Sequence, residues 1–252
     1  MNQTAIHIEQ LTVAYQAVPV LWQVGLNIQK GKRTAIIGPN GAGKSTLIKS
    51  ILGLMSPLTG EVDFSVKDGE WAEYKSIKKS VAYVPQKSSV DWDFPTTVLD
   101  VVVMGRYGHL GWFKRPGKKD MALAEEMLVK VGMHSFKDRQ ISQLSGGQRQ
   151  RVFLARALVQ QAEIYLLDEP LAGVDMKSEK VIMELLEELS SAGKTVIVVH
   201  HDLQTVKEYF DEVVFLNREV VAAGSVATTF TEDIIEETYR KDHSVAERVD
   251  QL

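Results

Sequence analysis

The sequence predicts an α/β fold with a mostly parallel sheet and a helical insertion. Short apolar runs typical of strands alternate with stretches whose apolar residues recur at helical spacing, and this alternation predicts helices on both faces of a parallel sheet. The pattern is interrupted between about Gln86 and Val159, where aromatic and turn residues precede two amphipathic stretches. The 252 residues are enough to bury a sizeable core.

Each expected element depends on a local pattern. Alternating or short apolar runs predict the strands, and apolar residues spaced three and four apart predict the helices. Pro57 stops the first expected helix. Pro85 closes the strand that directly precedes this proline, and Gly193 can end the helix that precedes this glycine. The expected elements are strands at 5–13, 24–28 and 34–37, a helix at 45–54, a strand at 81–84, helices around 121–131 and 152–159, a strand at 164–167, a helix around 182–189, a strand at 195–199, a helix at 203–210 and a strand at 213–216.

We expect a single domain over residues 1–252. Its core would comprise about 1–86 and 160–228, its helical subdomain about 87–159, and a polar, weakly helical tail would occupy 229–252.

Composition narrows the functional classes. A net charge of −4 indicates no global field for nucleic acid, and the absence of Cys excludes disulfides and thiolate metal sites. No apolar run approaches the roughly 20 residues of a membrane helix, and Met1–Gln10 lacks the pattern of a secretion signal. If the protein acts at a membrane, we expect another chain to span it.

A glycine-rich loop follows the strand at 34–37 and precedes the helix. It fits Gly-x-x-x-x-Gly-Lys-Ser, and the residues of the loop with the threonine after it are Gly38, Pro39, Asn40, Gly41, Ala42, Gly43, Lys44, Ser45 and Thr46. Glycines let the N–H groups point at phosphate oxygens, Lys44 supplies a point charge for the β- and γ-phosphates, and the Ser45 hydroxyl is a hard ligand for Mg²⁺. A plain turn is the alternative, but the strand-loop-helix context favours a nucleotide site.

Two carboxylates end the apolar strand at 164–167. The carboxyl ends of strands are where open parallel sheets bind ligands. Asp168 suits Mg²⁺ through a water molecule, and Glu169 suits polarisation of an attacking water. Solvated acids in a turn are the alternative, and the phosphate loop favours the catalytic interpretation.

A further anion-binding turn is predicted at Leu144-Ser145-Gly146-Gly147-Gln148. Its two glycines leave backbone N–H groups bare at the start of a helix, and such groups bind anions. A chain with one complete phosphate loop and a spare anion-binding turn indicates half of a shared site.

In these segments the chain resembles the ATP-binding subunit of an ABC transporter. Residues 38–46 resemble the Walker A motif, 164–169 resemble the Walker B motif, and 144–148 match the family signature, in family order. The resemblance runs from about Ile6 to Ala223. It implies a P-loop NTPase core with an N-terminal antiparallel β part and a helical insertion, and it implies ATP hydrolysis with Mg²⁺.

Three further positions acquire a role through this resemblance. Tyr15 stands where the family places an aromatic ring under adenine, although it could be a core strand residue. Gln86 matches the Q-loop glutamine, which touches Mg²⁺ or the attacking water and faces the membrane partner. Asp175 matches the D-loop aspartate that crosses the dimer, and it could also cap a helix.

Two adjacent histidines compete for the family's switch position. His201 precedes Asp202, as the switch histidine usually precedes an aspartate, so the resemblance implies that His201 contacts the γ-phosphate. His200 stands where the family often has Ser or Thr, and we expect it to end the strand as a packed or solvated residue.

The resemblance implies a head-to-tail homodimer with two ATP molecules at its interface. Ser145 and Gly147 of one copy would cover the γ-phosphate that the other copy holds, while Lys44, Glu169 and Gln86 act on it from the copy that binds it. The implied partners are a transmembrane permease and, indirectly, a metal-binding extracytoplasmic protein. The implied location is peripheral, on the cytoplasmic face of the membrane.

The segments 89–95 and 102–112 resemble the branch that imports manganese, zinc or iron. The resemblance implies that residues after the Q-loop contact the transmembrane subunit, so Trp92, Phe94 and Met104 favour a partner interface, although they could be core. His200-His201-Asp202 is also similar to the manganese members. We expect manganese, with zinc or iron as the alternative. The chain itself shows no metal-ligand spacing.

Two other functions fit parts of this pattern. A soluble ABC ATPase outside transport, for example a cluster-assembly factor, would share all the motifs. Translation-type members usually carry two nucleotide-binding halves and repair-type members a long coiled coil, neither of which this chain has. A P-loop kinase of a small metabolite would not need the turn at 144–148.

Overall fold

The computed structural model describes residues 4–16, 18–65, 70–86, 95–110 and 114–240. The chain divides into two compact units, the first comprising Met1–Lys78 and Ile197–Leu252 and the second Lys79–Val196. The boundaries predicted for the core, the helical subdomain and the tail stay predictions.

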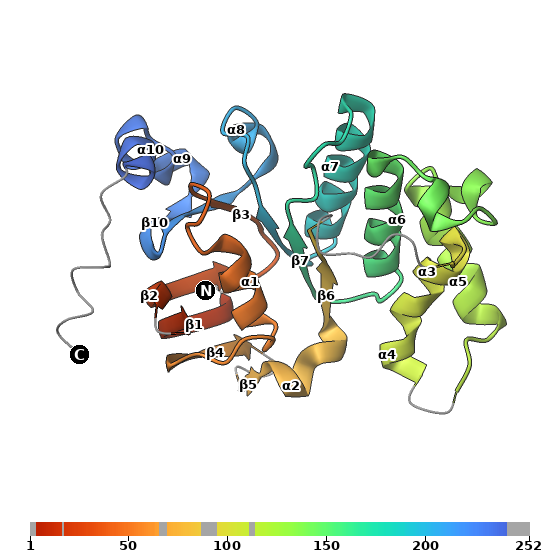
Figure 1. Ribbon diagram of the computed structural model, residues 1–252, viewed down its shortest axis with the longest axis horizontal. Helices are drawn as coiled ribbons and strands as arrows, with labels where there is room; N and C mark the ends of the chain where they lie inside the picture. The colour runs from red at the N-terminus through yellow and green to blue at the C-terminus, as the bar shows by residue number, and fades with distance from the viewer. Residues whose placement is uncertain (1–3, 17, 66–69, 87–94, 111–113, 241–252) are drawn as a thin grey trace. The chain divides into compact units, whose positions relative to one another are not determined.

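The first unit begins with a four-stranded antiparallel sheet in the order β2-β1-β4-β5 (Figure 1). Its strands are β1 (Thr4–Tyr15), β2 (Val18–Gln29), β4 (Thr59–Ser65) and β5 (Trp71–Glu73). Apolar residues that alternate along the sequence, such as Ile6 and Ile8 in β1, are buried on one face. The two predicted N-terminal strands are therefore confirmed, and β2 begins earlier than its alternation indicates.

The same unit holds the strand that enters the glycine-rich loop. β3 (Arg33–Ile37) pairs in parallel with β9 (Glu212–Asn217), and β10 (Glu219–Ser225) returns antiparallel to β9. β8 (Thr195–Val199) begins in the second unit and ends in the first unit. Directly after β8, the His200 N–H donates to the Ile36 carbonyl oxygen over 3.1 Å. Ile36 and Ile37 are fully buried, as expected for a strand covered on both faces.

Short helices complete the first unit. They are α1 (Lys44–Ile51), α2 (Tyr74–Ile77), α8 (Val206–Tyr209), α9 (Val226–Thr229) and α10 (Glu232–Tyr239). The helix predicted at 203–210 was wrong in extent, because the Asp202 carboxylate accepts a hydrogen bond from the Gln204 N–H over 2.9 Å and forms a turn before α8. In the tail, Thr231 caps α10, so the helical tendency is real at residues 232–239.

In the second unit a parallel strand pair is combined with helices. β6 (Val81–Val84) pairs with β7 (Ile164–Asp168), with Val84 opposite Leu167. The helices are α3 (Val98–Val103), α4 (Tyr107–Leu110), α5 (Lys118–Lys130), α6 (Gly146–Leu158) and α7 (Met176–Ser191), with 3-10 turns at η4 (Met104–Arg106), η5 (His134–Phe136) and η6 (Ile141–Gln143). α6 and α7 run side by side (Figure 1). The apolar faces predicted for α5 and α6 are buried, for example at Leu128 and Val152.

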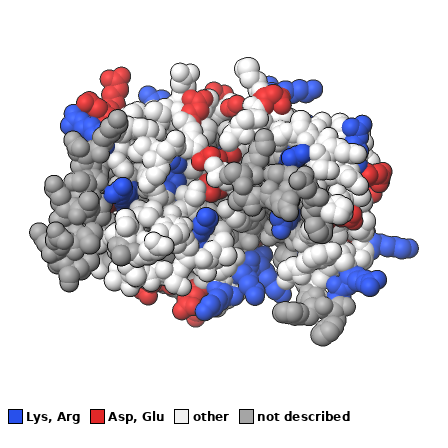
Figure 2. All heavy atoms as spheres, in the orientation of Figure 1, with Lys and Arg blue, Asp and Glu red and all other residues white. Residues whose placement is uncertain are grey.

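Three properties of the described residues bear on partners. Among the described residues, no helix combines the length and hydrophobicity needed to cross a bilayer. On the face that Figure 2 shows, Lys and Arg are interspersed with Asp and Glu. Within the same described residues, no group of three or more His, Cys, Asp or Glu gathers as the ligands of a metal ion would.

Candidate functional site

The glycine-rich loop leaves the carboxyl end of β3 and ends at the N-terminus of α1. Gly41 and Gly43 have φ angles of 81° and 91°, in the left-handed region that glycine adopts most easily. Gly43 is the N-cap residue of α1. The Lys44 side chain is buried, and its Nζ donates to the carbonyl oxygens of Gly38 and Pro39 over 2.7 and 2.8 Å. An ammonium group thus lies at a helix N-terminus, which is a site for anions.

The turn between β9 and β10 holds this loop from behind. The Arg218 N–H donates to the Ala42 carbonyl oxygen over 2.9 Å, and the Arg218 carbonyl oxygen accepts from the Trp22 N–H over 2.9 Å. A Cβ atom at Gly38 would lie 1.9 Å from the Leu216 carbonyl oxygen. The loop therefore packs backbone against backbone, and only a residue without a side chain fits at Gly38.

Replacing Gly38 by alanine should destabilise the protein by about 2 kcal/mol, because the new Cβ must displace the backbone at Leu216. Urea denaturation of the two proteins measures the difference. Gly25→Ala is the matched control, since Gly25 lies in β2 and a Cβ there meets nothing within 4 Å. Equal stability of Gly38→Ala and the unaltered protein would contradict the proposed close packing.

Tyr15 and the two histidines also belong to the first unit. Tyr15 ends β1 with 47% of its surface exposed, and its hydroxyl donates to Met55 Sδ over 3.1 Å, so it is not a core residue. His201 is exposed directly after β8, whereas His200 is 4% exposed. His200 thus ends the strand as a packed residue, which was one of its two expected states.

In the second unit, the acidic pair lies at the end of β7. Asp168 is 2% exposed. Burial raises the pKa of Tyr83 to about 12, and the nearby charge of Asp168 adds to this rise. Glu169 has a φ of 52°, which is uncommon for a residue with a side chain, and strained positions of this kind cluster at functional sites. Gln86 Nε2 donates to Glu169 Oε2 over 2.8 Å. The structure therefore brings Gln86 and Glu169 together.

Residues 144–148 form the start of α6. Ser145 is the N-cap: its Oγ accepts from the Gln148 N–H over 3.4 Å, and its own N–H donates to Gln148 Oε1 over 2.9 Å. The cap therefore bonds the Gln148 N–H, and the bare N–H groups expected at the two glycines stay a prediction. Gly146 is half-buried, and Gly147 is buried where it faces the next motif along the chain, at the start of α7.

That next motif is the N-cap of α7. Asp175 Oδ1 and Oδ2 accept from the Ser178 N–H and hydroxyl over 3.0 and 2.8 Å, and these two bonds hold the pKa of Asp175 below its usual value. The capping alternative for Asp175 is thus confirmed. A Cβ at Gly147 would lie 3.2 Å from Asp175 Oδ2. Within one chain, residues 144–148 and Asp175 are neighbours.

The segment predicted to face a membrane partner is only partly described. Trp92 and Phe94 lie outside the described residues. Met104 is half-buried, and Tyr107 is 54% exposed. Arg106 Nε donates to Asp120 Oδ1 over 2.9 Å, which joins η4 to the first turn of α5. Arg106 thus supports the fold, and Tyr107 is an exposed aromatic residue in the described part of the segment.

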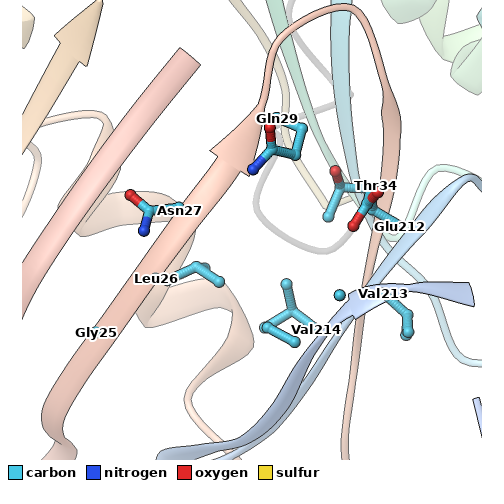
Figure 3. Close-up of a pocket in the computed structure, with 10 residues that line it drawn as sticks. Gly25, Leu26, Asn27, Gln29, Thr34, Glu212, Val213 and Val214 are labelled. Atoms are coloured by element: carbon cyan, nitrogen blue, oxygen red, sulfur yellow. The ribbon is translucent and has the colours of Figure 1, made fainter. Parts of the chain in front are cut away.

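A pocket of about 310 Å³ lies elsewhere in the first unit (Figure 3). Strand β2 forms one wall, and the start of β3 together with β9 and β10 forms the other. Thr34 and Glu212 line it at the amino ends of their strands, whereas the glycine-rich loop follows the carboxyl end of β3. This pocket is therefore separate from the predicted phosphate site.

Sequence reasoning missed the residues that support the site. Arg218 holds the loop through its backbone, and Thr205 contacts the ring of His200 through its hydroxyl. No local pattern marks Arg218, since its contact joins distant parts of the sequence. Near Thr205 the sequence indicated a helix at 203–210, and that pattern does not mark a contact with His200.

Comparison with known proteins places this geometry in context. The family model described as ABC transporter matches residues 21–172. A zinc transport system ATP-binding protein from Treponema pallidum is 55% identical over 93% of this chain and 86% of its own length. A manganese transport system ATP-binding protein from Bacillus subtilis is 54% identical over 93% of this chain and 92% of its own length.

Solved structures give the same relationship. An inward-facing ABC transporter of the metal-chelate type aligns with a TM-score of 0.80 and 30% identity, over 94% of this chain and 89% of that one. A dimeric ATP-binding cassette bound to ADP and phosphate aligns with a TM-score of 0.74 and 29% identity, over 88% and 98% of the two chains. With its family match and its relatives over nine tenths of its length, the chain belongs to the ABC transporter family, as an ATP-hydrolysing, ATP-binding subunit.

Proposed function

We propose that this chain energises a membrane importer of manganese or a related divalent metal by binding and hydrolysing ATP as a homodimer. The observation that supports the transport role most strongly is its 54–55% identity, over more than nine tenths of its length, to subunits named for manganese and zinc transport. The motifs offer particular side chains for nucleotide binding and for activation of the attacking water.

The first unit would bind the nucleotide. The curled backbone at Gly41 and Gly43, the N-terminus of α1 and the Lys44 ammonium would neutralise the triphosphate. The half-exposed ring of Tyr15 would stack under adenine. His201 would contact the γ-phosphate.

The second unit would activate water. The 2.8 Å bond from Gln86 Nε2 orients the Glu169 carboxylate, which would accept a proton from the attacking water. Phosphoryl transfer depends mainly on positioning and charge neutralisation, and this pair supplies the positioning.

Mg²⁺ fits the donor types that the motifs offer. The Ser45 hydroxyl, the Asp168 carboxylate and the Gln86 amide oxygen are hard oxygen donors, which Mg²⁺ prefers. When bound, the ion would neutralise charge on the phosphates. Buried Asp168 would hold it through a water molecule.

A second copy of the chain would complete the site. Ser145 is exposed at the start of α6, beside buried Gly147, and would cover the γ-phosphate held by the other copy. Asp175 would cross the dimer from the same region. A dimeric cassette bound to ADP and phosphate among the similar structures supports this arrangement. The dimer would sit peripherally on the cytoplasmic face of the membrane, bound to a permease, with exposed Tyr107 on the segment that meets it.

The decisive experiment is metal uptake by cells that carry this chain with its permease and an extracytoplasmic binding protein. Uptake of radioactive manganese should exceed that of zinc and should fall to background in Lys44→Ala, because the triphosphate loses its buried cation. Thr228→Ala, at the surface of α9, is the control and should keep full uptake.

Different outcomes separate the alternatives. Faster zinc uptake would favour a role in zinc import. The observation that supports this alternative is the 55% sequence identity to the zinc transport protein from Treponema pallidum. A chain that does not co-purify with the permease and supports no uptake would contradict transport and favour a soluble ABC ATPase.

A further inference from the structure

His200, the buried histidine of the adjacent pair, has no role in the proposed chemistry, yet its ring is fixed on several sides. It is 4% exposed and lies directly before His201. Its Nε2 is 2.8 Å from Thr205 Oγ1. Its ring packs against the Phe210 ring with the centroids 5.1 Å apart and the planes inclined by 52°.

The direction of the hydrogen bonds follows from the hydroxyl of Thr205. A hydroxyl has one proton, and Thr205 Oγ1 donates it to the Asp202 carbonyl oxygen over 3.2 Å. Thr205 therefore accepts from His200, so His200 carries its proton on Nε2. Burial lowers the pKa of His200, with the charge of His201 adding to this effect and Asp202 opposing it, which agrees with a neutral ring.

These bonds define a closed turn around His201. His200 and Thr205 join its two ends through the side chains, and the Gln204 N–H donates to Asp202 Oδ1 inside it. The His200 N–H donates to the Ile36 carbonyl oxygen over 3.1 Å, in the strand that enters the glycine-rich loop. The turn is thus tied to the strand before the phosphate site.

We propose that His200 is a positioning residue for ATP hydrolysis: by donating to Thr205, its ring fixes the turn at residues 201–205 and so directs His201 at the γ-phosphate. This inference rests on the proposed function, in which His201 contacts that phosphate. A side chain that packs like His200 but cannot donate would leave His201 on a looser turn. Turnover would then fall while nucleotide binding by the glycine-rich loop stayed intact.

The test compares steady-state ATPase kinetics of the assembled transporter for variants at both ends of the bond. His200→Leu keeps an apolar contact with Phe210, and Thr205→Val keeps the shape of threonine, but both remove the hydrogen bond. Each should lower kcat roughly five- to tenfold, the effect of one lost hydrogen bond, and leave KM for ATP within about twofold. The double variant should lose no more than either single one, because both remove the same bond.

Conservative variants, together with melting temperatures, test whether the loss of turnover comes from a general structural effect. Thr205→Ser keeps the hydroxyl and His200→Gln keeps an N–H donor, so both should recover most of kcat. Unchanged kcat in Thr205→Val, or losses that multiply in the double variant, would overturn the inference even if His200→Leu does not fold. Full turnover in His201→Ala would overturn the proposed role of His201 itself. Abolished turnover in His201→Ala with normal Thr205→Val would overturn the positioning role alone.

Discussion

Replacing Glu169 by glutamine should reduce ATP turnover about a thousandfold and leave a dimer that holds its ATP. The amide has nearly the shape of the carboxylate and can still accept the 2.8 Å bond from Gln86, but it cannot take a proton from water. Binding and dimer closure do not need this proton transfer, so they should remain. Turnover by phosphate release and molecular mass by light scattering, both with ATP and Mg²⁺, measure the two effects.

Glu163→Gln is the matched control for this prediction. Glu163 precedes β7, at the opposite end from Glu169, and its Oε1 pairs with Lys194 Nζ over 2.7 Å at the surface. A surface ion pair of this kind contributes little to the stability of the protein, so this variant should turn over ATP normally. Normal hydrolysis by Glu169→Gln would show that Glu169 is not the base.

Replacing Ser145 by aspartate should reduce turnover of the dimer about a hundredfold or more and leave ATP binding by the monomer nearly unchanged. Aspartate is as good an N-cap as serine, so α6 should remain intact. Its negative charge would face the γ-phosphate bound by the other copy and oppose closure. Fluorescent ATP binding, dimer formation and phosphate release measure the three steps separately.

Ser145→Asn is the neutral counterpart of this variant. Asparagine caps a helix equally well and adds no charge, so its loss of turnover should be much smaller. If Ser145→Asp formed closed dimers and hydrolysed ATP at the normal rate, Ser145 would not face the nucleotide of the other copy. The comparison tests the shared site directly.

The sequence could predict the elements whose signals are local. β6 and β8 have the predicted bounds because short apolar runs end at Pro85 and at a pair of polar histidines. The glycine-rich loop, the acidic pair and residues 144–148 lie at element ends, where the sequence places polar and glycine residues after apolar ones. The cap at Asp175 was open to prediction for the same reason.

Other features depend on contacts between distant residues. The edge strand β10 is half-exposed along its length, so no buried alternation marks it. The extent of α8 is set by the turn that Asp202 forms, which competes with helix at residues 202–205. The left-handed backbone of Glu169 contradicts its residue type and follows from the surrounding fold.

The contacts behind the glycine-rich loop have a consequence for how the protein folds during synthesis. Gly38 fits against the Leu216 carbonyl, and Ala42 accepts its backbone bond from Arg218. A growing chain must therefore add residues 216–218 before the loop has its final support, and contacts of such long sequence separation form late. A ribosome-bound fragment that ends before these residues lacks this support, although every residue of the loop itself has already been made.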